Sequence, residues 1–218
     1  MGTIRNMNGE AVGEVDSRNI FGRPFLCVYG KNKPRNWHEG VVERPLADGL
    51  TAYVRFEASD EVVETISSRE GFRAGGTIVA TRAILDFLKI DEDTLFRQAE
   101  LSMSADLTSM NKTLEKMGCP VPVDFPELPA YILTGHEDMY GAGAIASEII
   151  LKKIHEDMGD FTILPSSVHE VILMPQAKAD ECPFLAEMVA EINRTTVSAS
   201  DELSDNVYKY DSTGLHKA

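Results

Sequence analysis

Four residues within a short stretch could together do chemistry: Ser166, Ser167, His169 and Glu170. Nucleophilic catalysis requires a hydroxyl, a base within hydrogen-bonding reach and a group that orients the base. All three residue types occur here, although their order matches no catalytic motif. The four residues are therefore the candidates for a hydrolase-like site.

Two apolar runs flank this cluster, at residues 161–164 and 169–174, and a Pro-Ser-Ser-Val step joins them. The pattern predicts two short strands connected by a tight turn. Serines in tight turns usually bond to their own backbone, which makes a structural turn the simpler interpretation. Successive strand residues also point to opposite faces, so His169 and Glu170 are expected to diverge.

A catalytic arrangement would then need partners from another segment. His136, Glu137 and Asp138 are candidates, because they follow a predicted strand at 130–134. The same residues, together with His155 and His169, are also the possible metal ligands. None of them shows a paired ligand spacing such as H-x-x-x-H, so we predict no metal site.

The segment Gly141–Ala146 has the form G-x-G-x-x-A, which resembles a dinucleotide fingerprint. That fingerprint requires its first glycine directly after a strand, whereas six residues separate Thr134 from Gly141. We therefore expect the small residues to pack a helix closely on the sheet, and we predict no cofactor.

Strands and helices are mixed along the chain without regular alternation. We expect an irregular arm at 1–45, a single α+β domain at 46–212 and a tail at 213–218. Within the arm, residues 25–29 are a plausible strand and Trp37 is a packing anchor. Further strands are expected at 50–56 and 77–81, with a possible short helix at 60–66 and a possible edge strand at 207–210.

The apolar periodicity predicts a helix at 82–88 and a second helix that begins after an N-cap at Asp91. It also predicts helices at 107–117, 140–158 and 180–192. We expect the methionine-containing stripe of 107–117 and the stripe Leu185, Met188, Val189 and Ile192 to face the core. The order β-α-β-β-α after residue 130 favours a mixed or antiparallel sheet with helices mainly on one face.

The charge is strongly acidic and unevenly spread. The net charge is −14, and residues 46–175 carry 22 acidic against 10 basic side chains, whereas residues 1–45 carry 5 against 7. Phosphate contact needs cationic side chains, so direct binding of nucleic acid is not expected. No apolar run is long enough to cross a membrane, and three widely spaced cysteines fit a cytoplasmic protein.

Residues 130–211 resemble a family of uncharacterised bacterial proteins that is abundant in gut Firmicutes and often carried on mobile elements. The resemblance rests on Ile132-Leu-Thr134, Tyr140-Gly-Ala, the 161–170 stretch, Met188–Thr195 and Leu203–Tyr208, and it is weaker over 46–110. It implies a bacterial cytosolic protein and no assigned activity.

Two function classes remain open from the sequence. The first and favoured class is a non-enzymatic accessory protein that binds a basic partner, such as a nucleic-acid-binding protein, through an acidic surface. The second is a hydrolase-like enzyme that uses Ser166, Ser167 and His169. A concave pocket that contains these side chains and a carboxylate would favour the enzyme.

Overall fold

The structure, a computed structural model, describes residues 2–5, 11–15, 21–34, 37, 39–59, 76–118, 129–135, 140–165 and 167–218. The chain forms two compact units. The N-terminal unit comprises Met1–Phe25, Gly40–Val42 and Val54–Ser102. The C-terminal unit comprises Leu26–Glu39, Glu43–Tyr53 and Met103–Ala218.

The strands are β1 (Gly2–Arg5), β2 (Ala11–Val15), β3 (Phe21–Tyr29), β4 (Glu43–Ala47), β5 (Leu50–Ala58), β6 (Thr77–Val79), β7 (Ala105–Ser109), β8 (Tyr131–Gly135), β9 (Phe161–Leu164), β10 (Glu170–Pro175), β11 (Tyr208–Asp211) and β12 (Gly214–Lys217). The helices are α2 (Arg82–Leu88), α3 (Glu92–Ser102), α4 (Met110–Lys116), the 3-10 helix η3 (Gly141–Ala146), α5 (Glu148–Met158), α6 (Gln176–Ala179) and α7 (Leu185–Thr196). Strand pairs with a described register are antiparallel, and the predicted α+β class is confirmed.

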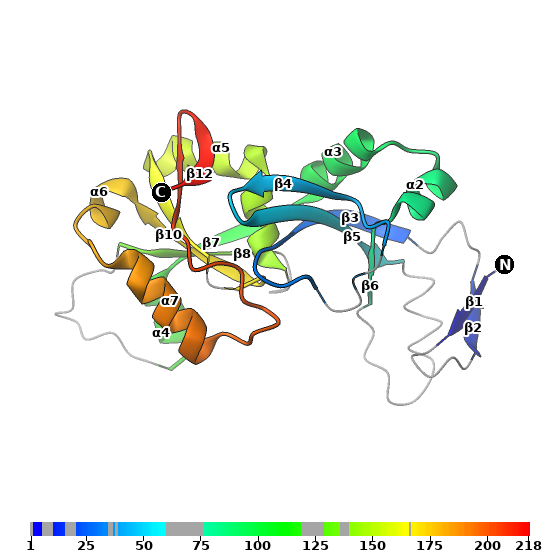
Figure 1. Cartoon of the computed structure of the whole chain (residues 1–218), viewed down its shortest axis with the longest axis horizontal. Helices are drawn as coiled ribbons and strands as arrows, with labels where there is room; N and C mark the ends of the chain where they lie inside the picture. Colours follow the sequence, from blue (N-terminus) through cyan, green and yellow to red (C-terminus); the bar gives the residue numbers. More distant parts are fainter. Residues whose placement is uncertain are drawn as a thin grey trace. The chain divides into compact units, whose positions relative to one another are not determined.

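A six-stranded sheet in the order β12-β11-β9-β10-β8-β7 forms the centre of the C-terminal unit. Helices cover both of its faces (Figure 1). On one face, η3 and α5 pack on a core that includes Phe161, Ile163, Val171 and Leu173. On the other face, Leu185 and Val189 of α7 pack on side chains such as Leu164 and Ile172. Adjacent strand residues point to opposite faces, and so β9 and β10 contribute to both cores.

Strands β9 and β10 lie where the apolar runs predicted them. Strand β11 is not an edge strand, however, because it pairs with β9 on one side and with β12 on the other. The β11–β12 turn contains Gly214 at a φ of 97°, and Asp211 accepts hydrogen bonds from Thr213. Residues 213–218, expected to be a tail, thus include a strand. Its sequence is largely polar and therefore lacks the apolar pattern that predicts a strand.

The predicted helix at 107–117 is wrong in its first part. Ala105–Ser109 form β7, which pairs with β8, and the helix α4 begins only at Met110. The hydroxyl of Ser109 caps α4 by accepting from the backbone of Lys112. Helix α4 has no buried residue and Met117 is exposed, so the methionine-containing stripe is not part of the core.

The predicted helix at 140–158 is interrupted. Residues 141–146 form η3, Ser147 caps the next helix by accepting from the backbone of Ile150, and α5 runs from Glu148. A 3-10 helix has fewer residues per turn than an α-helix. The 3-10 segment therefore changes which side chains of the following helix face the sheet. Leu151 is therefore buried, whereas Ile149 is exposed.

The N-terminal unit contains helices that the sequence located well. Helix α2 spans the predicted residues and is capped by Thr81, which accepts from the backbone of Ile84. The predicted cap Asp91 accepts from the backbone of Thr94, 2.7 Å away, at the start of α3. Strand β6 pairs with β5, and residues 1–45, expected to be irregular, include β1, β2, β3 and part of β4.

Trp37 belongs to the C-terminal unit and packs edge-on against Tyr29 and Tyr53. It is thus the packing anchor that the sequence suggested. The possible helix at 60–66 lies outside the described residues. No helix of the described chain is long and apolar enough to cross a membrane.

Candidate functional site

The candidate cluster of the sequence forms the turn between β9 and β10. The hydroxyl of Ser167 accepts hydrogen bonds from the backbone amides of His169 and Glu170, at 3.1 and 3.3 Å. The amide of Ser167 also donates to the carbonyl of Glu170. This bonding is typical of a serine that stabilises its own turn. Ser166 lies outside the described residues.

His169 also contacts backbone. Its Nδ1 accepts from the amide of Tyr140 at 3.4 Å, and the two rings contact each other. Because Nδ1 acts as an acceptor, the ring proton of a neutral imidazole lies on Nε2. Tyr140 has a φ of 55°, a conformation that few side chains adopt without support. His169 therefore supports the turn that precedes η3.

The described residues do not bring a catalytic group to Ser167. No described hydrogen bond joins its hydroxyl to the ring of His169, and Glu170 lies opposite Thr134 on β8. The expected partners His136, Glu137 and Asp138 lie outside the described residues. The hydrolase-like site therefore stays a prediction from the sequence.

The glycines of η3 pack against backbone, as the sequence suggested. A Cβ on Gly141 would collide with the carbonyl of His169, and a Cβ on Gly143 would collide with the carbonyl of Leu26. A phosphate needs open space beside the glycines of its binding loop. On these sides of η3, protein backbone occupies that space, and the small residues serve close packing.

His155 is held by a neighbouring carboxylate. Its Nε2 lies 2.8 Å from an oxygen of Asp160, and its ring packs edge-on against Tyr210. Among the described residues there is no group of three His, Cys, Asp or Glu side chains that could hold a metal ion.

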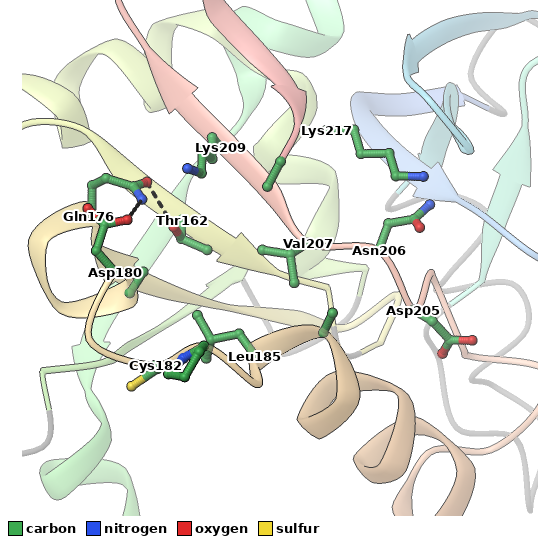
Figure 2. Close-up of a pocket in the computed structure, with 14 residues that line it drawn as sticks. Thr162, Gln176, Asp180, Cys182, Leu185, Asp205, Asn206, Val207, Lys209 and Lys217 are labelled. Atoms are coloured by element: carbon green, nitrogen blue, oxygen red, sulfur yellow. Dashed lines mark hydrogen bonds between the residues drawn. The ribbon is translucent and has the colours of Figure 1, made fainter.

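A pocket that the sequence did not indicate lies on the α7 side of the sheet (Figure 2). It has a volume of about 300 Å³ and is bounded by β9, β11, the end of β12 and the segment that joins α6 to α7. Leu185 and Val207 contribute apolar surface, and Lys209 and Lys217 contribute positive charge.

One wall of this pocket is a chain of hydrogen bonds. The hydroxyl of Thr162 donates to Oε1 of Gln176 at 3.0 Å, and Nε2 of Gln176 donates to the carboxylate of Asp180 at 2.7 Å. The predicted helix at 180–192 begins only at Leu185, as α7, and so it does not include Asp180, which follows α6. Its carboxylate instead fixes the orientation of the Gln176 amide.

The acidic residue at the opposite rim, Asp205, already has a cationic partner. Lys31 donates to Asp205 and to Glu202. The hydrogen bond from Lys31 lowers the pKa of Asp205 below its usual value. Within the described residues Lys209 forms no ion pair, whereas Lys217 lies 3.4 Å from the carboxylate of Asp48.

Helix α7 buries a different stripe from the one expected. Leu185, Val189 and Asn193 face the sheet, because the amide of Asn193 donates to the carbonyl of Ser204 at 2.9 Å and to Asp205 at 3.2 Å. A polar residue at a buried position breaks the apolar pattern, so periodicity alone selected the neighbouring stripe. The expectation that Met188 and Ile192 face the core is wrong.

Three large apolar side chains are consequently exposed along α7. Phe184 is 66 % exposed, Met188 54 % and Ile192 40 %. Residues four apart on a helix are surface neighbours, so these three form one continuous stripe. The exposed carboxylates of Glu187 and Glu191 lie beside it, and that of Glu191 is paired with the guanidinium of Arg194 at 2.6 Å. We call these five residues the α7 surface.

A protein family described as a family of unknown function (DUF5688) matches residues 62–212, which is most of the chain. No curated protein and no solved structure matches the chain.

Proposed function

The chain belongs to the family of unknown function DUF5688, and we propose that it is a non-enzymatic interaction domain that binds a basic protein partner through the α7 surface. The exposed stripe of Phe184, Met188 and Ile192 is the observation that carries this proposal. A single exposed apolar side chain is ordinary in a folded protein. Three neighbours on one helix, whose opposite stripe is buried, are typical of a helix that docks into a groove.

The charge beside the stripe indicates what kind of partner fits. Glu187 borders the apolar side chains with an exposed carboxylate, Glu191 beside it is paired with Arg194, and the whole chain carries a net charge of −14. A partner groove that accepts the stripe therefore gains from lysine or arginine side chains at its rim. The negative field of the chain also accelerates encounter with such a partner, in a salt-dependent way. A nucleic-acid-binding protein presents a surface of this kind.

We further propose a cytosolic accessory role on a bacterial mobile element. The resemblance of residues 130–211 to proteins of such elements supports the role. The cellular location is supported by Cys27 and Cys182, which are free thiols and fit a reducing compartment.

The proposal is tested by affinity capture from a bacterial lysate with three versions of the whole chain. The first is the native chain, and the second carries Phe184→Ala, Met188→Ala and Ile192→Ala. The third carries Leu101→Ala and Met117→Ala, which remove exposed apolar side chains that belong to α3 and to the C-terminal end of α4. We expect a specific basic protein to bind the native chain and the third version but not the second, because only the second lacks the α7 stripe.

Charge reversal then tests the acidic border. We expect Glu187→Lys, which leaves the Glu191–Arg194 ion pair intact, to slow association with the captured protein and to flatten the dependence of its affinity on salt. Lys152→Glu on α5 is a control that alters charge away from α7. Capture of the same proteins by the native and the α7-substituted chains would exclude the α7 surface as the binding site.

A further inference from the structure

We propose that the pocket beside Lys209 binds a small organic anion, with the anionic group on the lysine ammonium and an apolar body against Leu185 and Val207 (Figure 2). Lys209 is the centre of this proposal. It lies on β11 directly opposite Thr162 of β9, and cross-strand partners have side chains in close contact. Its side chain is half-buried, and within the described residues it has no ion-pair partner.

The acidic groups near the pocket are engaged elsewhere. Asp180 accepts from the Gln176 amide, and Asp205 accepts from Lys31 and Asn193. Neither carboxylate therefore neutralises Lys209 through a described contact. The pocket thus combines a partly desolvated cation with carboxylates that are already bonded, which favours an anionic ligand.

The polar wall orients a ligand without adding charge. The Thr162 hydroxyl and the Gln176 side chain are locked by their mutual hydrogen bond and by Asp180. An amide nitrogen has two protons, and Nε2 of Gln176 uses one on Asp180, so one remains for a ligand oxygen. A fixed donor beside a lysine can hold the two oxygens of one carboxylate or phosphate group.

The volume of the pocket decides the size of the ligand. About 300 Å³ is the lower end of the range found for small-molecule sites. This space holds a short-chain acid or a small phosphate ester, but not a folded segment of another protein. The acidic body of the chain weakens anion binding only modestly, because charges more than about 8 Å away are largely screened at physiological salt.

The test uses three probes with one apolar body: hexanoate, hexyl phosphate and neutral hexan-1-ol. Each is titrated at physiological salt into the isotope-labelled whole chain, and backbone amide shifts are followed by NMR. We expect saturable shifts at residues around the pocket with at least one anionic probe, and binding at least tenfold weaker with the alcohol, since a hydrogen bond to a charged group contributes about that factor. The stronger of the two anions identifies the preferred group.

Two variants with the same net charge distinguish a direct contact between Lys209 and the anion from the effect of the overall charge of the chain. Lys209→Met keeps the apolar stem and removes the ammonium, whereas Lys152→Met removes an exposed ammonium on α5. We expect Lys209→Met to weaken the anion about tenfold and the alcohol less than twofold, and Lys152→Met to leave both unchanged. Equal weakening by the two variants, or the absence of saturable shifts with both anions, would overturn the proposal.

Discussion

Leu185 and Ile192 offer a matched test of how α7 is oriented. The two side chains are isomers, so replacement by alanine removes the same three carbon atoms from each. Leu185 is 8 % exposed and Ile192 is 40 % exposed, and burial is therefore the main difference between the two sites. The comparison isolates burial more cleanly than either substitution alone.

The expected costs follow from that burial. At Leu185, loss of three buried methylene equivalents at about 0.8 kcal/mol each, with a cavity term, gives about 3 kcal/mol. At Ile192, solvent fills the space, the lost burial is partial, and alanine improves helix propensity by about 0.4 kcal/mol. We therefore expect Ile192→Ala to cost about 1 kcal/mol or less.

The assay is urea unfolding followed by fluorescence of Trp37, the only tryptophan of the chain. Trp37 packs against Tyr29 and Tyr53 within the C-terminal unit, so its emission reports on the unit that contains α7. The free energy of unfolding comes from linear extrapolation to zero urea. Equal costs for the two substitutions, or a larger cost at Ile192, would show that the exposed stripe is buried and would remove the basis for the α7 surface.

Two further predictions concern packing and pH. Gly143→Ala should lower the free energy of unfolding by about 1–3 kcal/mol, because its methyl group meets a backbone carbonyl; Gly76→Ala, whose Cβ would lie 3.8 Å from Ala58, is the near-neutral control, and equal urea midpoints would contradict the prediction. Burial, with hydrogen bonds to carboxylates, raises the pKa of Tyr29 and of Tyr210 from 10.0 to about 12. The folded state thus retains these protons longer than the unfolded state, and their contribution to stability is present below pH 10.0 and lost up to about pH 12. Near-ultraviolet titration of the whole chain beside Tyr29→Phe and Tyr210→Phe should show that each removed phenol ionises near pH 12, and ionisation near pH 10.0 would refute the assignment.

Sequence patterns predicted elements well where local signals agree. Helix α2 and strand β9 have the predicted bounds, because each is a short apolar run with clear flanking signals. Strands β7 and β12 were missed for one reason: their residues are largely polar, and they become strands by pairing with β8 and β11. Pairing with a distant strand leaves little trace in the sequence of a short segment.

At the candidate sites too, contacts between neighbours in the chain were predictable and contacts between distant segments were not. The turn bonding of Ser167 was predictable, since it involves only neighbours in the chain. The orientation of α7 was not, because it depends on Asn193 bonding to Ser204, a contact outside the helix. The pocket was not predictable either, because it combines Thr162, Gln176 and Lys209 from three separate elements.

The core of the C-terminal unit joins residues that are synthesised far apart in time. Val28 and Leu50 are buried in the same core as Leu203 and Tyr208. The hydroxyl of Tyr208 donates to the carbonyl of Asp48 across a sequence separation of 160 residues, and Lys31 bonds to Asp205 across 174.

Such long-range contacts form slowly, because the intervening chain must be ordered before they contribute. Ribosomes add roughly 5–20 residues each second, so residues 28–50 wait roughly ten to thirty seconds for the strands that complete their core. During that interval Val28 and Leu50 lack Tyr208 of β11, which completes their core. The nascent chain is thus open to chaperones and proteases over that period, and a fragment limited to residues 62–212 would lack Val28 and Leu50 from its core.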